Sequence, residues 1–186
     1  GAVASAVLDG YGLNDIRVER TTGFLSDHYD PMSRTLRLSP GVYDTPSVTA
    51  VGIAAHETGH ALQHADGYLP LQARTAIVPV VQFGSYLGPL VFMLGLLLQI
   101  TPLAWAGVFL FGGVALFALI TLPVEFDASR RAKEVLAGQG YVWGDEMVGV
   151  NRVLDAAALT YVAGLAQALS TLLYYVFILT GGRRRR

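Results

Sequence analysis

His56, Glu57 and His60 have the spacing of a metal-binding helix. The two histidines are four residues apart, so a helix places both imidazoles on one face, where they can bind the same ion. Glu57 points about 100° away around the helix axis, where it can take a proton from water at that ion. This HExxH pattern is typical of zinc hydrolases, mostly peptidases, in which the carboxylate is the general base. We therefore expect Zn²⁺ as the cofactor.

The context of the motif favours a metal site over a polar patch on a helix surface. The chain has only four histidines, and three of them are His56, His60 and His64. Residues 48–55 are small or apolar, which predicts a buried helix, and burying unpaired polar groups is costly. A bound metal is the simplest partner for them. Because the chain has no cysteine, the ligands must be His, Asp or Glu, the usual set of catalytic zinc sites.

The composition predicts an integral membrane protein. Hydrophobic residues make up 53% of the chain and charged residues 15%, whereas soluble domains carry about 25% charged residues. Residues 75–124 and 156–182 contain no charged residue or histidine, and each stretch exceeds the ~20 residues that cross a bilayer. A channel or transporter fits poorly, because these spans carry no ionisable residue. The net charge of −1 gives no indication of a nucleic acid partner.

The expected fold is mainly α, with three transmembrane helices and a small α/β extramembrane, zincin-like region that carries the HExxH helix. Five segments are expected in order: a small α/β extramembrane region (1–48), the HExxH helix (49–70), a transmembrane hairpin (75–122), extramembrane helices with the third ligand (123–156), and a transmembrane helix with an arginine-rich tail (157–180 and beyond).

Local patterns place the smaller elements. Residues 16–20 and 35–39 alternate apolar and polar side chains and predict strands, with turn-forming residues at 27–31 between them. We expect a small hairpin or meander, whose second strand is a candidate for edge pairing with an extended substrate. Pro123 is expected to open a new helix, and a short helix over 145–154 is expected before the last span.

Catalytic zinc usually takes three protein ligands, and three residues compete for the third place. Asp66 follows His60 by six residues. However, the third residue after His60 is Gln63, not the glycine that would turn the chain back on the metal. His64 follows His56 by eight residues and so lies about 80° around the helix from it. Glu125 is favoured, because the transmembrane hairpin returns the chain to the membrane surface from which the motif helix departs. Its same-face neighbours are small, which allows two helices to approach closely.

Three segments together resemble the YugP-like family of bacterial membrane zinc metallopeptidases: SDHYDP (26–31), HETGHALQH (56–64) and LPVEFDASRR (122–131). The resemblance covers essentially the whole chain and implies a relative of the integral-membrane gluzincins, which include the CaaX prenyl protease. In those relatives a glutamate on a later helix completes the zinc site and opens a Glu-x-Glu-Ala-Asp pattern. This chain has Ser129 in place of the aspartate, and Asp127 is the expected substitute as a support for the histidines. The resemblance also implies a membrane helix ahead of Gly1.

These observations predict a gluzincin-like metalloendopeptidase of the cell membrane, in a bacterial inner or plasma membrane, that hydrolyses peptide bonds with zinc-activated water and Glu57 as general base. The candidate oxyanion donors are His28, Tyr43, His64 and Arg130. The expected partners are the lipid bilayer and a membrane-associated peptide or protein substrate, without nucleic acid. The alternative is a zinc-binding membrane scaffold or regulator without peptidase turnover, against which the intact Glu57 argues.

Overall fold

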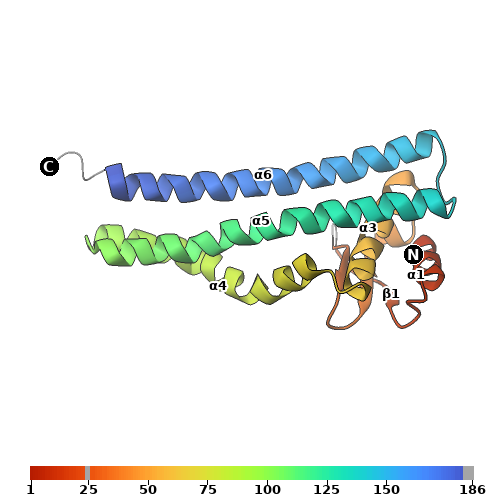
Figure 1. Cartoon of the computed structure of the whole chain (residues 1–186), viewed down its shortest axis with the longest axis horizontal. Coiled ribbons are helices and arrows are strands. Elements are labelled where there is room, and N and C mark those ends of the chain that lie inside the picture. The colour runs from red at the N-terminus through yellow and green to blue at the C-terminus, as the bar shows by residue number, and fades with distance from the viewer. Residues whose placement is uncertain (24–25, 182–186) are drawn as a thin grey trace. The chain divides into compact units, whose positions relative to one another are not determined.

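The computed structural model of the chain describes residues 1–23 and 26–181 (Figure 1). The described residues form six helices and three short strands. They divide into two compact units, of which the first comprises Gly1–Leu71 and Val124–Leu159, and the second comprises Gln72–Pro123 and the residues from Thr160 onward. The expected arginine-rich tail, residues 183–186, lies outside the described residues.

The first unit begins with helix α1 (Ala2–Gly10) and a three-stranded sheet made of β1 (Arg17–Arg20), β2 (His28–Asp30) and β3 (Thr35–Leu38). The strand order is β1-β3-β2, with β3 parallel to β1 and antiparallel to β2. The two alternating strands are therefore present, but they pair in parallel, and the turn expected at 27–31 is a strand. Three residues are too few for alternation to outweigh a turn-forming composition.

Strand β3 is the central strand of the sheet, because it pairs with β1 on one side and with β2 on the other. Its main chain is thus already hydrogen-bonded, and the expectation that the strand at 35–39 offers an edge to a substrate is wrong. Within the described residues, β2 pairs only with β3. The other side of β2 faces the helix that carries the HExxH motif, as its contacts described below show.

Two helices follow the sheet, the short α2 (Pro40–Tyr43) and the motif helix α3 (Val48–Ala65). Ser47 caps α3, since its hydroxyl accepts a hydrogen bond of 3.1 Å from the Ala50 N–H. Gly67, with φ of 65°, follows the end of the helix. One side of α3, which includes Ala54 and Ala61, packs on buried apolar residues of α1, the sheet, the residue before β1, and α2: Ala4, Leu8, Ile16, Tyr29, Leu36, Leu38 and Val42.

Helices α5 (Thr101–Gly138) and α6 (Asp145–Gly181) are longer than expected. Pro123 lies inside α5 instead of opening a new helix, and the short helix expected over 145–154 is continuous with the last span. Proline removes one backbone hydrogen bond, but membrane helices tolerate the loss better than soluble ones. Glu125 is therefore an interior residue of a long helix, and regular helical geometry determines on which face of α5 it lies.

The second unit contains α4 (Leu69–Leu97) from Gln72 onward and the apolar parts of α5 and α6. Each of the three helices is long and apolar enough to cross a membrane. Glycines allow α4 and α5 to pack closely, because a Cβ at Gly95 would overlap the backbone of Ala104 and one at Gly107 would overlap that of Phe92. The chain is thus a mainly α, multi-pass membrane protein, as its composition predicts.

Candidate metal centre

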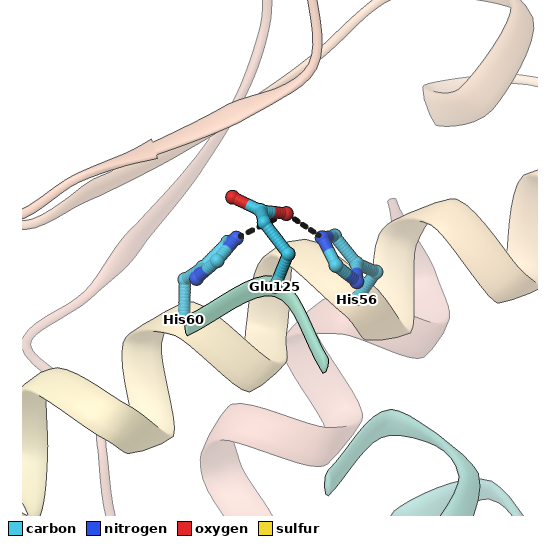
Figure 2. Close-up of side chains that lie close together, drawn as sticks. All are labelled: His56, His60 and Glu125. Atoms are coloured by element: carbon cyan, nitrogen blue, oxygen red, sulfur yellow. Dashed lines mark hydrogen bonds and ion pairs between the residues drawn. The ribbon is translucent and has the colours of Figure 1, made fainter. Parts of the chain in front are cut away.

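Two imidazoles of α3 and one carboxylate of α5 meet in the first unit (Figure 2). His56 Nε2 lies 3.1 Å from Glu125 Oε2, and His60 Nε2 lies 3.6 Å from the same oxygen. One ligand atom from each residue lies within 4.8 Å of the others. The two rings meet edge to face, with their centroids 4.9 Å apart. The spacing of the two histidines places them on one helix face, as expected, and residues far apart in the chain supply the three side chains.

A glycine allows the two helices to approach this closely. A Cβ added at Gly59 would lie 2.5 Å from the main-chain oxygen of Ala128 on α5, well inside normal contact distance. Ala128 and Ala132 on the same part of α5 are also fully or almost fully buried. Small residues on both helices therefore bring the backbones together at the level of the three ligand atoms.

The three side chains form a buried group that attracts positive charge. Glu125 is 1% exposed and His60 is 8% exposed. Burial lowers the pKa of His60, but the hydrogen bond and charge of Glu125 and the charge of Glu57 together outweigh it and raise the pKa above its ordinary value. Two imidazoles and a carboxylate that converge in this way can hold a divalent metal ion.

Both histidines are oriented through Nδ1, which turns Nε2 toward Glu125. His56 Nδ1 lies 3.1 Å from Ser129 Oγ, and His60 Nδ1 lies 2.9 Å from Gln63 Oε1. Ser129, which stands where the resemblance to the gluzincins implies an aspartate, thus contacts His56 itself. Asp127 does not take over that contact; its carboxylate accepts a hydrogen bond of 2.9 Å from the Gln63 amide and so reaches His60 indirectly.

Glu57 is held by the edge strand of the sheet. Its Oε2 accepts a hydrogen bond of 3.1 Å from the main-chain N–H of Tyr29 on β2. The hydroxyl of the same tyrosine lies 2.8 Å from His64 Nδ1, two helical turns beyond Glu57 on α3. Tyr29 therefore attaches β2 to the motif helix at two points, one of which is the proposed general base.

The remaining candidates make other contacts. The carboxylate of Asp66 is exposed and pairs with Arg131. Neither Asp66 nor His64 belongs to the group of converging ligand atoms. Arg130 is exposed and pairs with Asp127 and Glu134. His28 Nδ1 lies 2.8 Å from the Ser26 main-chain oxygen. Tyr43 lines a cavity of about 300 Å³ that is bounded by α1, α2 and the start of α3 and is lined by none of the three converging residues.

Sequence reasoning missed the roles of Gln63 and Tyr29. Gln63 lies three residues after His60, on the same helix face, and that spacing could have identified it. Tyr29 was hidden because residues 27–31 have the composition of a turn. Its contact with Glu57 uses a main-chain N–H, which no side-chain pattern reveals.

A family model described as "Putative neutral zinc metallopeptidase" matches residues 1–180. A curated relative named "Putative membrane protease YugP", from Bacillus subtilis (strain 168), is 48% identical over 180 residues, which cover 97% of this chain and 80% of the relative. No solved structure matches the chain.

Proposed function

Because the chain belongs to the family of neutral zinc metallopeptidases, we propose that it is a membrane-embedded zinc endopeptidase. In this proposal His56, His60 and Glu125 bind Zn²⁺, and Glu57 is the general base. The observation that carries it is the convergence of two Nε2 atoms and one carboxylate oxygen next to Glu57.

The donor group fits zinc in type, and the two separations that involve Glu125 fit zinc in spacing. Two histidines and one glutamate are a ligand set of catalytic zinc, and they leave one position of a tetrahedral ion open. Bonds of about 2.0–2.2 Å to one tetrahedral ion place its donor atoms about 3.4 Å apart. The separations of 3.1 and 3.6 Å between the imidazole nitrogens and Glu125 Oε2 lie on either side of this value.

In this proposal Glu57 carries out the proton transfers of the reaction. When bound, zinc supplies Lewis acidity, which promotes loss of a proton from water near neutral pH and polarises a peptide carbonyl. The Tyr29 N–H holds Oε2 of Glu57, so Oε1 is the oxygen that takes the proton of the attacking water. Glu57 then gives that proton to the amine released when the peptide bond breaks.

Strand β2 does not offer the substrate a free main-chain donor at the site, because the N–H of Tyr29 already donates to Glu57. The membrane location favours substrates that are themselves in or on the bilayer.

Two variants of the purified, detergent-solubilised protein test the proposal, with bound zinc measured by elemental mass spectrometry and cleavage measured on unfolded casein. Glu57→Gln keeps the shape of the side chain but accepts no proton, so we expect full zinc content and a loss of activity of about 10²–10⁴-fold. Glu125→Ala removes a ligand, so we expect a loss of zinc. Glu146→Gln, the same amide change at an exposed residue of α6, is the matched control.

The two variants test separate parts of the proposal. Wild-type activity in Glu57→Gln would exclude Glu57 as the general base, and unchanged zinc in Glu125→Ala would exclude that residue as a ligand. If the wild-type protein binds zinc but cleaves neither casein nor any protein of its own membrane, compared by proteomics with Glu57→Gln, the scaffold function is correct instead.

A further inference from the structure

Gln63 is a completely buried polar residue next to the donor group, with 0% of its surface exposed. It lies on α3, and its side chain bridges to α5. Its Oε1 lies 2.9 Å from His60 Nδ1, while its Nε2 donates 2.8 Å to the Val124 main-chain oxygen and 2.9 Å to Asp127 Oδ2. Both amide protons and the carbonyl oxygen are therefore used.

These partners allow only one orientation of the amide. Val124 and Asp127 both present oxygen acceptors, so the NH₂ group of Gln63 must face them. If the amide were reversed, its oxygen would face a carbonyl and a carboxylate in a buried space, which is unfavourable. Oε1 must then face His60, and because it can only accept, His60 Nδ1 must carry a proton.

We propose that Gln63 is the positioning residue that fixes the metal-binding tautomer of His60. A neutral imidazole protonated at Nδ1 carries its lone pair on Nε2, the nitrogen that faces Glu125. Because Val124 and Asp127 orient the Gln63 amide, the tautomer of His60 also depends on the position of α5, the helix that carries the third ligand. This inference rests on the proposed zinc site and assigns a role to a residue outside it.

The two histidines differ in this respect. His56 Nδ1 contacts the hydroxyl of Ser129, and a hydroxyl can either donate or accept. Ser129 therefore supports the position of His56 without selecting its tautomer. We expect loss of the Gln63 amide to weaken zinc binding more than loss of the Ser129 hydroxyl.

Gln63→Met tests the inference, because methionine has a similar shape but neither accepts from Nδ1–H strongly nor donates to α5. We expect the zinc dissociation constant, measured by competition with a chromogenic chelator, to rise about 10–100-fold. Ser129→Ala should raise it less. Thr58→Val is the matched control, because Thr58 is also buried on α3 but its hydroxyl donates to the Ala54 main-chain oxygen within the same helix; its dissociation constant should stay within about twofold of wild type.

Nuclear magnetic resonance of ¹⁵N-histidine reports which ring nitrogen of His60 carries the proton. This property would not change if Gln63 only supported the fold. The chain has only four histidines, so the signal of His60 can be assigned by substitution. Zinc on Nε2 would itself force the proton onto Nδ1, so the measurement is made on zinc-free protein at a pH above the pKa of His60. In the zinc-free wild type we expect His60 to carry its proton on Nδ1, with slow exchange, and in zinc-free Gln63→Met we expect fast exchange or a changed tautomer.

A wild-type protein that binds no zinc would overturn the proposed function, and this inference with it. If the wild type binds zinc but Gln63→Met binds it equally tightly, or if His60 Nδ1 carries no proton, only the inference is wrong. A Gln63→Met protein that does not fold leaves the wild-type tautomer measurement as the deciding result.

Discussion

At the scale of single residues, the polar groups of the proposed metal centre form one continuous series of contacts. The carboxylate of Glu125 contacts both imidazoles, and the second nitrogen of each imidazole contacts a different side chain. Burial makes these contacts effective, because a polar group that is removed from water loses more when its partner is absent. A substitution of any of these side chains should therefore alter the metal affinity of the site as well as the positions of its neighbours.

The raised pKa of His60 predicts that acid weakens zinc binding. Zinc binds the neutral imidazole, so it must displace any proton on Nε2. Because Glu125 and Glu57 raise the pKa of His60 despite its burial, that proton competes up to a higher pH than for an ordinary histidine. Affinity should be highest above the raised pKa and fall roughly tenfold per pH unit below it for each proton displaced. Chelator competition at several pH values measures this, and a flat profile from pH ~5 to ~8 would contradict it.

Residue spacing in the sequence identified the histidine pair and pointed to Glu125, because helical periodicity is a local property and the order of the spans limits where the chain can return. It did not identify Gln63 or Tyr29 as neighbours of the motif. The contact of Gln63 with His60 follows the local i, i+3 spacing of α3 and was overlooked. The contacts of Gln63 with α5 and of Tyr29 with α3 depend on tertiary packing, which local periodicity does not specify.

At the scale of elements, the contact between α3 and α5 depends on Gly59. Gly59→Ala would place a methyl group 2.5 Å from the Ala128 main-chain oxygen, and a backbone atom cannot move aside alone. The helices must separate where they carry the ligands. We expect a destabilisation of about 1–3 kcal/mol and weaker zinc binding, measured by thermal unfolding in detergent and by chelator competition.

Gly52→Ala is the matched control, because Gly52 lies on the same helix but its added Cβ would make an ordinary contact of 3.7 Å with Val150. Alanine favours the helix by up to about 1 kcal/mol over glycine, so this variant should be at least as stable as wild type. If both variants behave alike, close approach at Gly59 is not what holds the two helices together.

Element boundaries were harder to predict than element types. The apolar stretches identified the membrane helices, but proline suggested a break at Pro123 where α5 continues. The cost of proline depends on whether surrounding groups satisfy the freed carbonyl, which is a tertiary property. The order of strands in the sheet was equally undetermined, because β2 is too short to show alternation.

At the scale of the whole molecule, the metal centre draws its residues from the two chain segments of the first unit. Metal binding should therefore stabilise that unit and leave the second largely unchanged. At a zinc concentration 100 times the dissociation constant the gain is about 2.7 kcal/mol. Hydrogen exchange followed by mass spectrometry should show faster exchange in α3 and in residues 124–138 after chelation, with α4 unaffected. Equal changes in α4 would show that the metal acts on the entire chain.

The first unit is interrupted in the chain by residues 72–123 of the second, and this has a practical consequence for making a water-soluble form. No terminal truncation can discard the α4–α5 hairpin while keeping both the HExxH helix and Glu125. A fragment ending at Leu71 retains only two of the three donors. A water-soluble form of the first unit would thus require excision of the intervening hairpin and a designed linker from Leu71 to Val124, with a second cut near Leu159.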